Sequence, residues 1–360
     1  MSTISRKSEH IRVCVEEDVE PRDANNGLDA FRFDHDALPD LDFDEVDTGA
    51  SLLGRNLRWP FFIGSMTGGT QGARDLNTRL AVAAARSGCG MALGSLRPAL
   101  EDPDSLPTFD VRKAAPDLPL LLGNIGIAQM ADPRLPDRLP PVCERLRLDG
   151  LIVHLNPMQE VLQPEGDTRF KGLLDRLVDF RRLMKQSLDL PLVIKEVGSG
   201  FSESTSARLR AVDPDLIETA GTGGTSWIRV EGLRGGDPVR SRCSVTLAGW
   251  GHSLAQSISN VRKAMPGTGI VASGGLRTGL DLAVALRLGA SAGAMALPLL
   301  KAALEGSDRL DEALDTVLFE LRAVMFGTGS RTLADLKRAP MMDTNGEQVP
   351  LSESPPQTQD

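Results

Sequence analysis

The sequence predicts an α/β fold in which eight parallel strands and their helices close into a (β/α)₈ TIM barrel with an N-terminal extension. From residue 60 onward, short apolar runs rich in β-forming residues alternate with longer amphipathic stretches, which is the pattern of parallel strands joined by helices. Eight such units over about 240 residues match a closed barrel. An open doubly wound sheet is the alternative, but the turn after the first run lacks a Gly-x-Gly-x-x-Gly phosphate motif.

The eight expected strands are apolar runs bounded by turn residues, at residues 60–65, 89–95, 118–123, 150–155, 191–197, 216–220, 269–273 and 292–297. The expected helices between them include residues 73–86, 173–186, 253–264 and 279–288. In the first of these helices Leu76, Leu80 and Ala83 fall on one face. Thr278 is placed to cap the last of them.

The chain divides into three parts by composition. Residues 1–58 form an N-terminal arm and edge segment, residues 59–338 the barrel, and residues 339–360 a tail rich in Pro, Ser, Gln and Asp that we expect to be disordered. Within the arm, acidic residues of the stretch 40–47 alternate with Leu41, Phe43 and Val46. This alternation indicates an edge strand or an extended arm.

Composition argues against several classes of partner. A net charge of −9 and 4% aromatic residues with no Tyr disfavour both electrostatic binding of nucleic acid and a base-stacking platform. No apolar run approaches the roughly 20 residues that span a bilayer, and residues 1–12 are polar, unlike a signal peptide. The four cysteines are far apart, so we interpret them as buried thiols of a cytoplasmic protein.

Polar or glycine-rich clusters follow nearly every expected strand, where a parallel barrel has its active site. Lys195 ends the apolar run 191–194 and should point into the barrel mouth, where it would stabilise an anion or form a Schiff base. The alternative is a lysine paired with Glu196 or Glu218. The stretch 273–279 is a candidate phosphate loop, because its glycines and the helix that follows expose backbone N–H groups and Arg277 adds charge. An ordinary turn with a surface arginine is the alternative.

The stretch 154–160 combines residue types suited to proton transfer and to binding a hard cation. His154 and Gln159 lie in it, and Glu160 is a carboxylate with few acidic neighbours, as in sites that hold Mg²⁺ together with substrate phosphates. His10 lies in a basic cluster near the N-terminus, which is either functional or a solvated terminus. His35 and His252 have no supporting motif.

In this order the motifs resemble those of type 2 isopentenyl-diphosphate isomerase, from Arg6 to about Gly327. The matching pieces are Arg6-Lys7-x-x-His10, Met66-Thr67-Gly68-Gly69, Gly94-Ser95 with Arg97, His154-Leu155-Asn156-Pro157-x-Gln159-Glu160, Gln163-Pro164-Glu165-Gly166-Asp167, Lys195-Glu196-Val197-Gly198, Gly223-Gly224-Thr225 and Ser273-Gly274-Gly275-x-Arg277-Thr278-Gly279. The resemblance implies an FMN-containing barrel that needs Mg²⁺, uses NADPH as flavin reductant and forms homo-tetramers or homo-octamers. It also implies interconversion of isopentenyl and dimethylallyl diphosphate by an allylic proton shift.

Carried over motif by motif, the resemblance implies a role for each of these residues. The catalytic residues would be Gln159, Lys195 and His154, and the metal ligand Glu160. The flavin contacts would be Ser65, Met66, Thr67, Ser95, Asn124, Lys195, Thr225, Gly275, Arg277, Ala296 and Leu297. The substrate contacts would be Arg6, Lys7, His10, Ser95, Leu96, Arg97, Asn156, Gln159, Trp227 and Glu231.

The chain departs from the family pattern at two places. Ala220 stands where the family usually has Ser, which removes a flavin contact, and the stretch 252–254 reads His-Ser-Leu where the family usually has Ile-Pro-Thr, which puts the shape of that loop in doubt. Two other functions fit these residues less well. An FMN-dependent 2-hydroxy-acid oxidase or dehydrogenase needs a histidine base beside an arginine after a late strand, and His252 lacks that context. A purely binding or regulatory barrel would not need the polar residues of 154–160.

Overall fold

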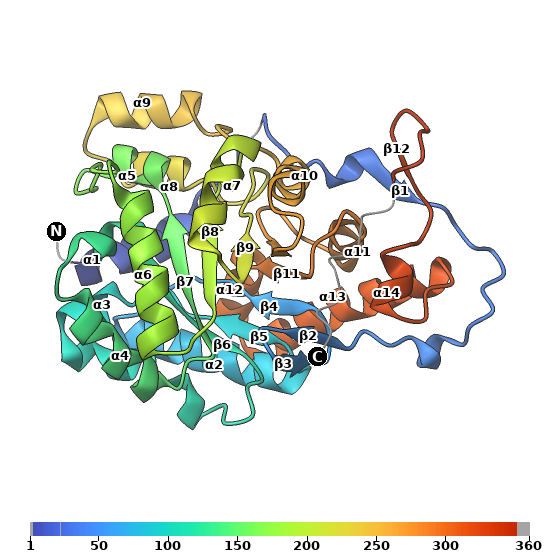
Figure 1. Ribbon diagram of the computed structural model, residues 1–360, viewed down its shortest axis with the longest axis horizontal. Helices are drawn as coiled ribbons and strands as arrows, with labels where there is room; N and C mark the ends of the chain where they lie inside the picture. The colour runs from blue at the N-terminus through green and yellow to red at the C-terminus, as the bar shows by residue number, and fades with distance from the viewer. Residues whose placement is uncertain (1–2, 22, 351–360) are drawn as a thin grey trace.

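The computed structural model, which describes residues 3–21 and 23–350, is built around a closed parallel barrel (Figure 1). Its eight strands follow one another around the barrel in chain order, so the predicted fold class is confirmed and the open sheet is excluded. The strands are β4 (Phe61–Ile63), β5 (Gly90–Ala92), β6 (Leu121–Gly126), β7 (Gly150–Leu155), β8 (Leu192–Glu196), β9 (Leu216–Glu218), β10 (Gly269–Ala272) and β11 (Ala292–Met295). Each expected strand is present, with ends shifted by up to three residues.

The helices surround this barrel (Figure 1). The α-helices of the barrel region are α2 (Gln71–Ser87), α3 (Arg97–Glu101), α4 (Leu135–Leu146), α5 (Pro157–Leu162), α6 (Leu173–Ser187), α7 (Glu203–Leu209), α8 (Trp227–Leu233), α9 (Pro238–Thr246), α10 (Leu254–Ala264), α11 (Gly279–Arg287), α12 (Leu297–Glu305), α13 (Ser307–Gly327) and α14 (Leu333–Leu336). The four expected helices correspond to α2, α6, α10 and α11. Thr278 caps α11 as predicted, because its hydroxyl accepts from the Asp281 N–H at 3.0 Å.

Two hydrophobic cores hold the barrel. The larger lies between the strands and the helices. The smaller fills the barrel interior with inward-facing side chains such as Phe62, Ile152 and Val193, and it includes Leu52 and Leu57. These two leucines belong to a hairpin of β2 (Ala50–Leu52) and β3 (Arg55–Leu57). The hairpin packs on one end of this core, which leaves the polar residues at the carboxyl ends of the strands to line the opposite end.

The N-terminal extension contains a helix rather than only an extended arm. Helix α1 (Thr3–Glu16) buries Val13 and Cys14 in the larger core. The expected edge strand at 40–47 is wrong, because Phe43–Glu45 forms a 3₁₀ turn. A capping box holds the turn, with the Glu45 carboxylate accepting the Asp42 N–H at 3.0 Å, and the Phe43 ring packs against Phe319.

Part of the expected disordered tail is ordered. Strand β12 (Met341–Asp343) pairs antiparallel with β1 (Phe31–Phe33) of the extension. The buried Arg287 guanidinium donates to the carbonyl oxygens of Ala339 at 2.7 Å and Val349 at 2.8 Å. The disorder predicted from composition is therefore wrong for residues 339–350, because their order depends on pairing with β1 and on contacts with Arg287. Residues 351–360 lie outside the described part of the chain.

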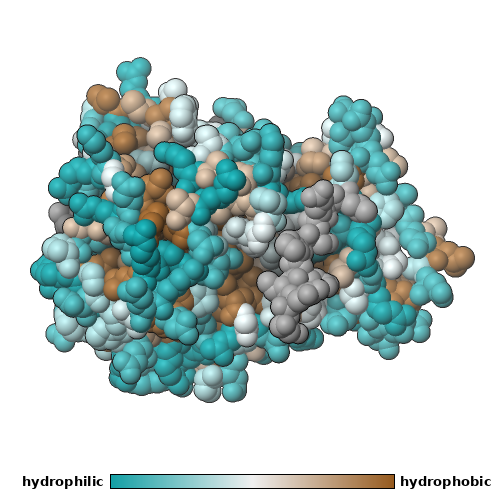
Figure 2. Space-filling model, in the orientation of Figure 1, coloured by the Kyte–Doolittle hydropathy of each residue, from teal (hydrophilic) through white to brown (hydrophobic). Residues whose placement is uncertain are grey.

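None of the helices described is long and apolar enough to cross a membrane. Most side chains on the face in Figure 2 are hydrophilic, and the hydrophobic ones are scattered among them. Val239 and Val245 of α9 are exposed. Cys14, Cys89 and Cys143 are buried free thiols, and burial raises the pKa of each to about 12. Cys243 is exposed, which corrects the expectation that all four thiols are buried.

Candidate active site

Polar side chains line a cavity at the carboxyl end of the barrel because strand side chains alternate between the two faces. Ile152, Val193 and Leu216 fill the interior core, and the residues two positions further along their strands are His154, Lys195 and Glu218. These three residues line the cavity, together with Asn124 and Ser273 at the ends of other strands. The hydrophobic core thus continues directly into the polar site.

Lys195 forms an ion pair with the carboxylate of Glu218, whose side chain is 1% exposed. The Ser273 hydroxyl donates to the same carboxylate oxygen at 2.9 Å. Lys195 therefore points into the barrel mouth, as predicted, and also has a partner. Glu196 faces the other side of β8, where it accepts N–H groups from Val197 and Gly198, and burial raises its pKa to about 7.

His154 is held in a neutral form. Its Nδ1 lies 2.7 Å from the side-chain oxygen of Asn124, so Nδ1–H donates and Nε2 remains an acceptor. Burial, together with the charges of Lys195 and Lys7, lowers the pKa of His154 to about 4. The imidazole can therefore accept a hydrogen bond at Nε2 in the cavity without adding charge at neutral pH.

Glu160 and Gln159 lie on α5, whose first turn follows strand β7 directly. The Asn156 side-chain amide donates to Glu160 at 2.8 Å and to Gln159 at 3.1 Å. The other oxygen of Glu160 accepts the backbone N–H of Asp167 at 2.7 Å. Gly166 allows this return of the chain, since a Cβ there would collide with the Glu160 carbonyl oxygen. The predicted metal ligand is thus held by its own helix and by the next loop.

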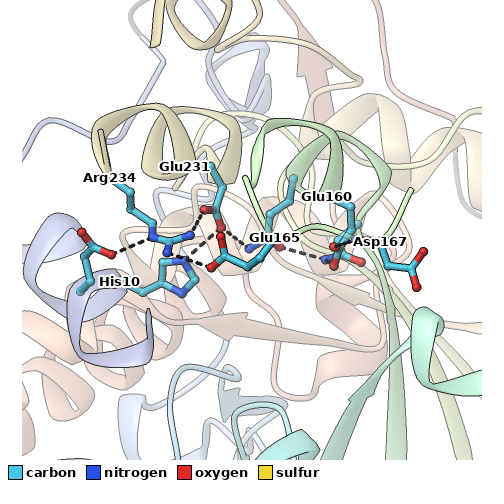
Figure 3. Close-up of polar contacts among 9 residues, drawn as sticks. His10, Glu160, Glu165, Asp167, Glu231 and Arg234 are labelled. Atoms are coloured by element: carbon cyan, nitrogen blue, oxygen red, sulfur yellow. Dashed lines mark hydrogen bonds and ion pairs between the residues drawn. The ribbon is translucent and has the colours of Figure 1, made fainter. Parts of the chain in front are cut away.

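Helices α1 and α8 cover one side of the cavity. From α1, Lys7 donates to the Ser95 carbonyl oxygen at 2.8 Å, and His10 stands edge-on to the Trp227 ring at 5.1 Å. Glu231 of α8 accepts from His10 Nε2 at 3.0 Å and from Gln159 at 2.9 Å. Figure 3 shows His10 and Glu231 pointing toward one another across the two helices. Burial opposes ionisation of Glu231, but its hydrogen bonds and the charge of His10 leave its pKa below the ordinary value.

The glycine-rich turns after β9 and β10 meet closely at the other side of the cavity. A Cβ on Gly224 would lie 2.6 Å from the Gly275 backbone nitrogen, so glycine is required for this approach. The Asn26 side chain donates to the Gly275 carbonyl oxygen at 2.8 Å. Arg277, the basic residue of the candidate phosphate loop, pairs with Glu20 of the extension at 2.5 Å.

Most residues assigned by resemblance line this one cavity: Ser65, Met66, Thr67, Ser95, Asn124, Lys195, Thr225, Gly275, Arg277, Ala296, Leu297, Lys7, His10, Arg97, Asn156, Gln159, Trp227, His154 and Glu160. Two expected substrate contacts do not. The side chain of Leu96 is buried in the larger core, and Glu231 lies behind His10 and Gln159 with its side chain fully buried. The side chain of Arg6 lies outside what the structure describes.

The two departures from the family pattern have different outcomes. Ala220 lines the cavity and has a φ of 39°, a left-handed conformation unusual for a residue other than glycine. His252 lines a separate cavity beside Glu196 and Trp250. His252 is therefore not among the residues that line the cavity of the candidate flavin contacts.

Sequence reasoning named Glu218 only as one of two alternative partners of Lys195, and it assigned no site role to Glu20 or Asn26. Glu218 could have been preferred over Glu196, because it lies two positions after the inward-facing Leu216. Glu20 and Asn26 gave no signal, since they lie in the irregular part of the extension and reach the glycine turns only by a long-range contact, 257 residues apart for Glu20 and Arg277.

Comparison with known proteins decides the family. The isopentenyl-diphosphate delta-isomerase of Nostoc sp. is 42% identical over 94% of this chain and 95% of its own length. The chain belongs to the isopentenyl-diphosphate delta-isomerase family. The Synechococcus sp. member of this family is 43% identical over 92% of this chain and 94% of its own. A family model described as FMN-dependent dehydrogenase matches residues 250–343, which indicates the FMN-dependent, type 2 form of the family.

Solved structures support the fold of this isomerase family member. A flavocytochrome b2 variant aligns with a TM-score of 0.65 at 17% identity, over 98% of this chain and 90% of its own. A mandelate oxidase variant aligns with a TM-score of 0.59 at 16% identity, over 93% and 92% of the two chains. At sequence identities this low, the structural similarity shows the barrel fold but not the reaction.

Proposed function

We propose that this chain interconverts isopentenyl and dimethylallyl diphosphate, using reduced FMN and Mg²⁺, in isoprenoid biosynthesis. The observation that carries the proposal is the position of Gln159. Its amide is held between the Glu231 carboxylate at 2.9 Å and the Asn156 amide at 3.1 Å, in the wall of a cavity that Lys195 and His154 also line. An allylic isomerisation adds one proton at a terminal carbon, removes another two carbons away and needs no net oxidation.

The cavity offers suitable partners for FMN. Among the residues described, the buried hydroxyls of Ser65 and Thr67 and one oxygen of Glu218 have no hydrogen-bond partner, so polar atoms of a bound ring would satisfy them. Together with the Gly224–Gly275 turns and Arg277, they form a cradle suited to an isoalloxazine ring and a phosphate. Reduced FMN would supply an electron-rich plane that stabilises positive charge at the tertiary carbon or exchanges the proton, with NADPH as its reductant.

Glu160 fits a Mg²⁺ ion bound together with substrate. No group of three or more His, Cys, Asp or Glu residues that could hold a metal occurs in the described part of the chain. An ion at Glu160 would therefore complete its coordination with diphosphate oxygens and water, which is the usual arrangement for Mg²⁺. The diphosphate itself would contact Lys7 and Arg97, the cationic side chains that line the cavity beside Ser95.

Three further side chains of the cavity, Lys195, His154 and Gln159, would stabilise charge and position the substrate. Lys195 would stabilise negative charge on the reduced ring, and its pairing with Glu218 holds its ammonium group in the mouth. His154 stays neutral and donates no charge to the carbocation region. Gln159 is too weak an acid to act alone, and its hydrogen bond to Glu231 would orient it to position the substrate or relay a proton.

The wider setting of the chain is also proposed. Exposed Val239, Val245 and Trp250 on the barrel rim support contact between copies of the chain, which we assign to a homo-tetramer or homo-octamer. The buried free thiols favour a reducing compartment, the cytoplasm. The partner expected at the site is a small diphosphate rather than nucleic acid.

The test is an anaerobic assay with isopentenyl diphosphate, photoreduced FMN and Mg²⁺ in D₂O. One reduction should support many turnovers, with deuterium entering dimethylallyl diphosphate and no reductant consumed. Consumption of one reductant per product would instead show oxidoreductase chemistry, and equal turnover by the oxidised protein would show that the reaction does not need reduced FMN. A 2-hydroxy acid serves as the competing substrate, and we expect it to give no turnover because His252 lines a different cavity.

A further inference from the structure

Arg234, directly after α8, brings together carboxylates from three separate segments of the chain. Its Nε lies 3.1 Å from Glu9 of α1, its Nη2 lies 3.0 Å from Glu165 of the loop after α5, and its Nη1 lies 2.5 Å from Glu231 of α8. The side chain of Arg234 is only 4% exposed. Figure 3 shows the guanidinium of Arg234 beside the side chains of Glu231 and Glu165.

Only arginine has the geometry for this arrangement. The guanidinium presents its N–H donors in a rigid planar fork, whereas the ammonium of lysine is a compact point charge. Each of the three carboxylates here meets a different nitrogen of the same fork. Without the arginine, several negative charges would lie close together in a poorly solvated place and would repel one another.

Each carboxylate belongs to a segment that supplies a different part of the candidate site. Glu9 lies on α1 between Lys7 and His10, which both line the cavity. Glu165 lies in the loop whose Asp167 N–H donates to Glu160 at 2.7 Å. Glu231 accepts the Gln159 amide at 2.9 Å.

We propose that Arg234 is a positioning residue that joins the diphosphate-binding helix to the metal-holding loop, so that it adds to the coupling that direct contact gives between diphosphate and Mg²⁺. The inference rests on the proposed function. Holding α1 closed would place Lys7 beside the ligand, and the same guanidinium would hold the loop that orients Glu160. Each ligand would then favour the arrangement that the other requires, which is positive coupling between the two sites.

The test compares Arg234→Lys with Arg229→Lys, a matched variant on the same α8 helix whose arginine contacts Ser244 of α9. In the holoenzyme we expect Arg234→Lys to raise both the KM for the diphosphate and the Mg²⁺ concentration for half-activity by at least roughly tenfold, the scale seen when residues that orient metal ligands are lost. The FMN dissociation constant and the Tm should change little, since the candidate flavin contacts lie on other elements. Arg229→Lys should leave all four quantities unchanged.

Two further variants test separately the contacts of Arg234 with Glu9 and with Glu165. Glu9→Gln should raise mainly the KM, and Glu165→Gln should raise mainly the Mg²⁺ requirement. When either change is combined with Arg234→Lys, its effect should be smaller than in the unmodified protein. Hydrogen exchange without any ligand should show faster exchange in both α1 and residues 163–167 of Arg234→Lys. This ligand-free measurement tests the junction even if the isomerase assay of the unmodified protein fails.

Three outcomes would overturn the proposal. The first is unchanged exchange in α1 and the loop, with unchanged KM and Mg²⁺ requirement. The second is a loss of FMN affinity and Tm in proportion to the loss of activity, which would make Arg234 a general stabilising residue. The third is purely additive effects of Glu9→Gln and Arg234→Lys, which would exclude a junction between the two residues.

Discussion

Lys195 and Glu218 form a buried ion pair at the floor of the barrel cavity, and Ser273 donates to the same carboxylate oxygen. The pair joins two neighbouring strands, β8 and β9, whose residues 195 and 218 are in register. The second carboxylate oxygen of Glu218, Oε2, has no hydrogen-bond partner among the described residues. The negative charge of Glu218 offsets that of Lys195, so the pair limits how strongly Lys195 stabilises a bound anion.

The first prediction concerns the effect of the Lys195 charge on bound FMN. Glu218→Gln removes the compensating charge, so Lys195 should stabilise the anionic reduced flavin more strongly. We expect the two-electron potential of bound FMN to rise by on the order of 30 mV, equivalent to about 1.4 kcal/mol. Anaerobic titration against a reference dye measures it, with Glu203→Gln on the surface as control. A potential that falls, or that moves equally in the control, would contradict this role of the pair.

The second prediction concerns the metal. Glu160→Gln removes the carboxylate charge, and because glutamine has one acceptor oxygen it can keep only one of the two hydrogen bonds from Asn156 and Asp167. We expect most activity to be lost and the Mg²⁺ requirement to rise by on the order of tenfold or more. Glu144→Gln, an exposed residue of α4, is the matched control. A Mg²⁺ titration like that of the unmodified protein would remove Glu160 as the ligand.

The third prediction concerns the substrate arm. Lys7 donates to the Ser95 carbonyl oxygen and lines the cavity. Lys7→Gln should raise the KM for the diphosphate on the order of tenfold through the loss of about one charged hydrogen bond, while FMN affinity stays the same. Steady-state kinetics measures this, and the exposed Lys171→Gln provides the comparison. If the KM is unchanged in Lys7→Gln, or after deletion of residues 1–10, the N-terminal arm does not contribute to substrate binding.

The fourth prediction concerns pH. The pKa of His154 is lowered to about 4, whereas an unfolded histidine titrates near 6.5. Between these values the unfolded chain binds a proton that the folded chain does not, so this group makes stability fall as pH falls from about 6.5 to about 4. In His154→Gln, the Tm should change less with pH between about 6.5 and about 4 than it does in the unmodified protein. An NMR titration placing the His154 imidazole near 6.5 would contradict the prediction, and measurement at pH 8 separates out any packing effect.

The fifth prediction concerns the C-terminal segment. A chain ending at residue 338 would lose the carbonyl oxygens that Arg287 contacts and would lose β12. Because this leaves a buried charge without its partners, we expect the free energy of unfolding to drop by about 3–5 kcal/mol. Urea denaturation measures it. A chain ending at residue 350 keeps every one of these acceptors and should be as stable as the full chain; equal stability of the shorter chain would show that the segment contributes nothing.

The sequence by itself determined the barrel and most of the cavity lining. Strand and helix periodicities are local signals, and parallel closure brings the carboxyl ends of all strands to one face. Asn124, His154 and Lys195 could be placed together for that reason, although they come from three strands. The same alternation would also have chosen Glu218 over Glu196 as the partner of Lys195, because only Glu218 shares its face.

The tertiary structure alone decided how the mouth is closed. The Glu9–Arg234 and His10–Glu231 contacts join residues 225 and 221 positions apart, and no local pattern in the sequence indicates such a pairing. The order of residues 339–350 likewise depends on β1 and Arg287. Composition and periodicity report what a segment prefers by itself, whereas the side chains that a docked helix or a paired terminal strand meets are set by packing between segments distant in the chain.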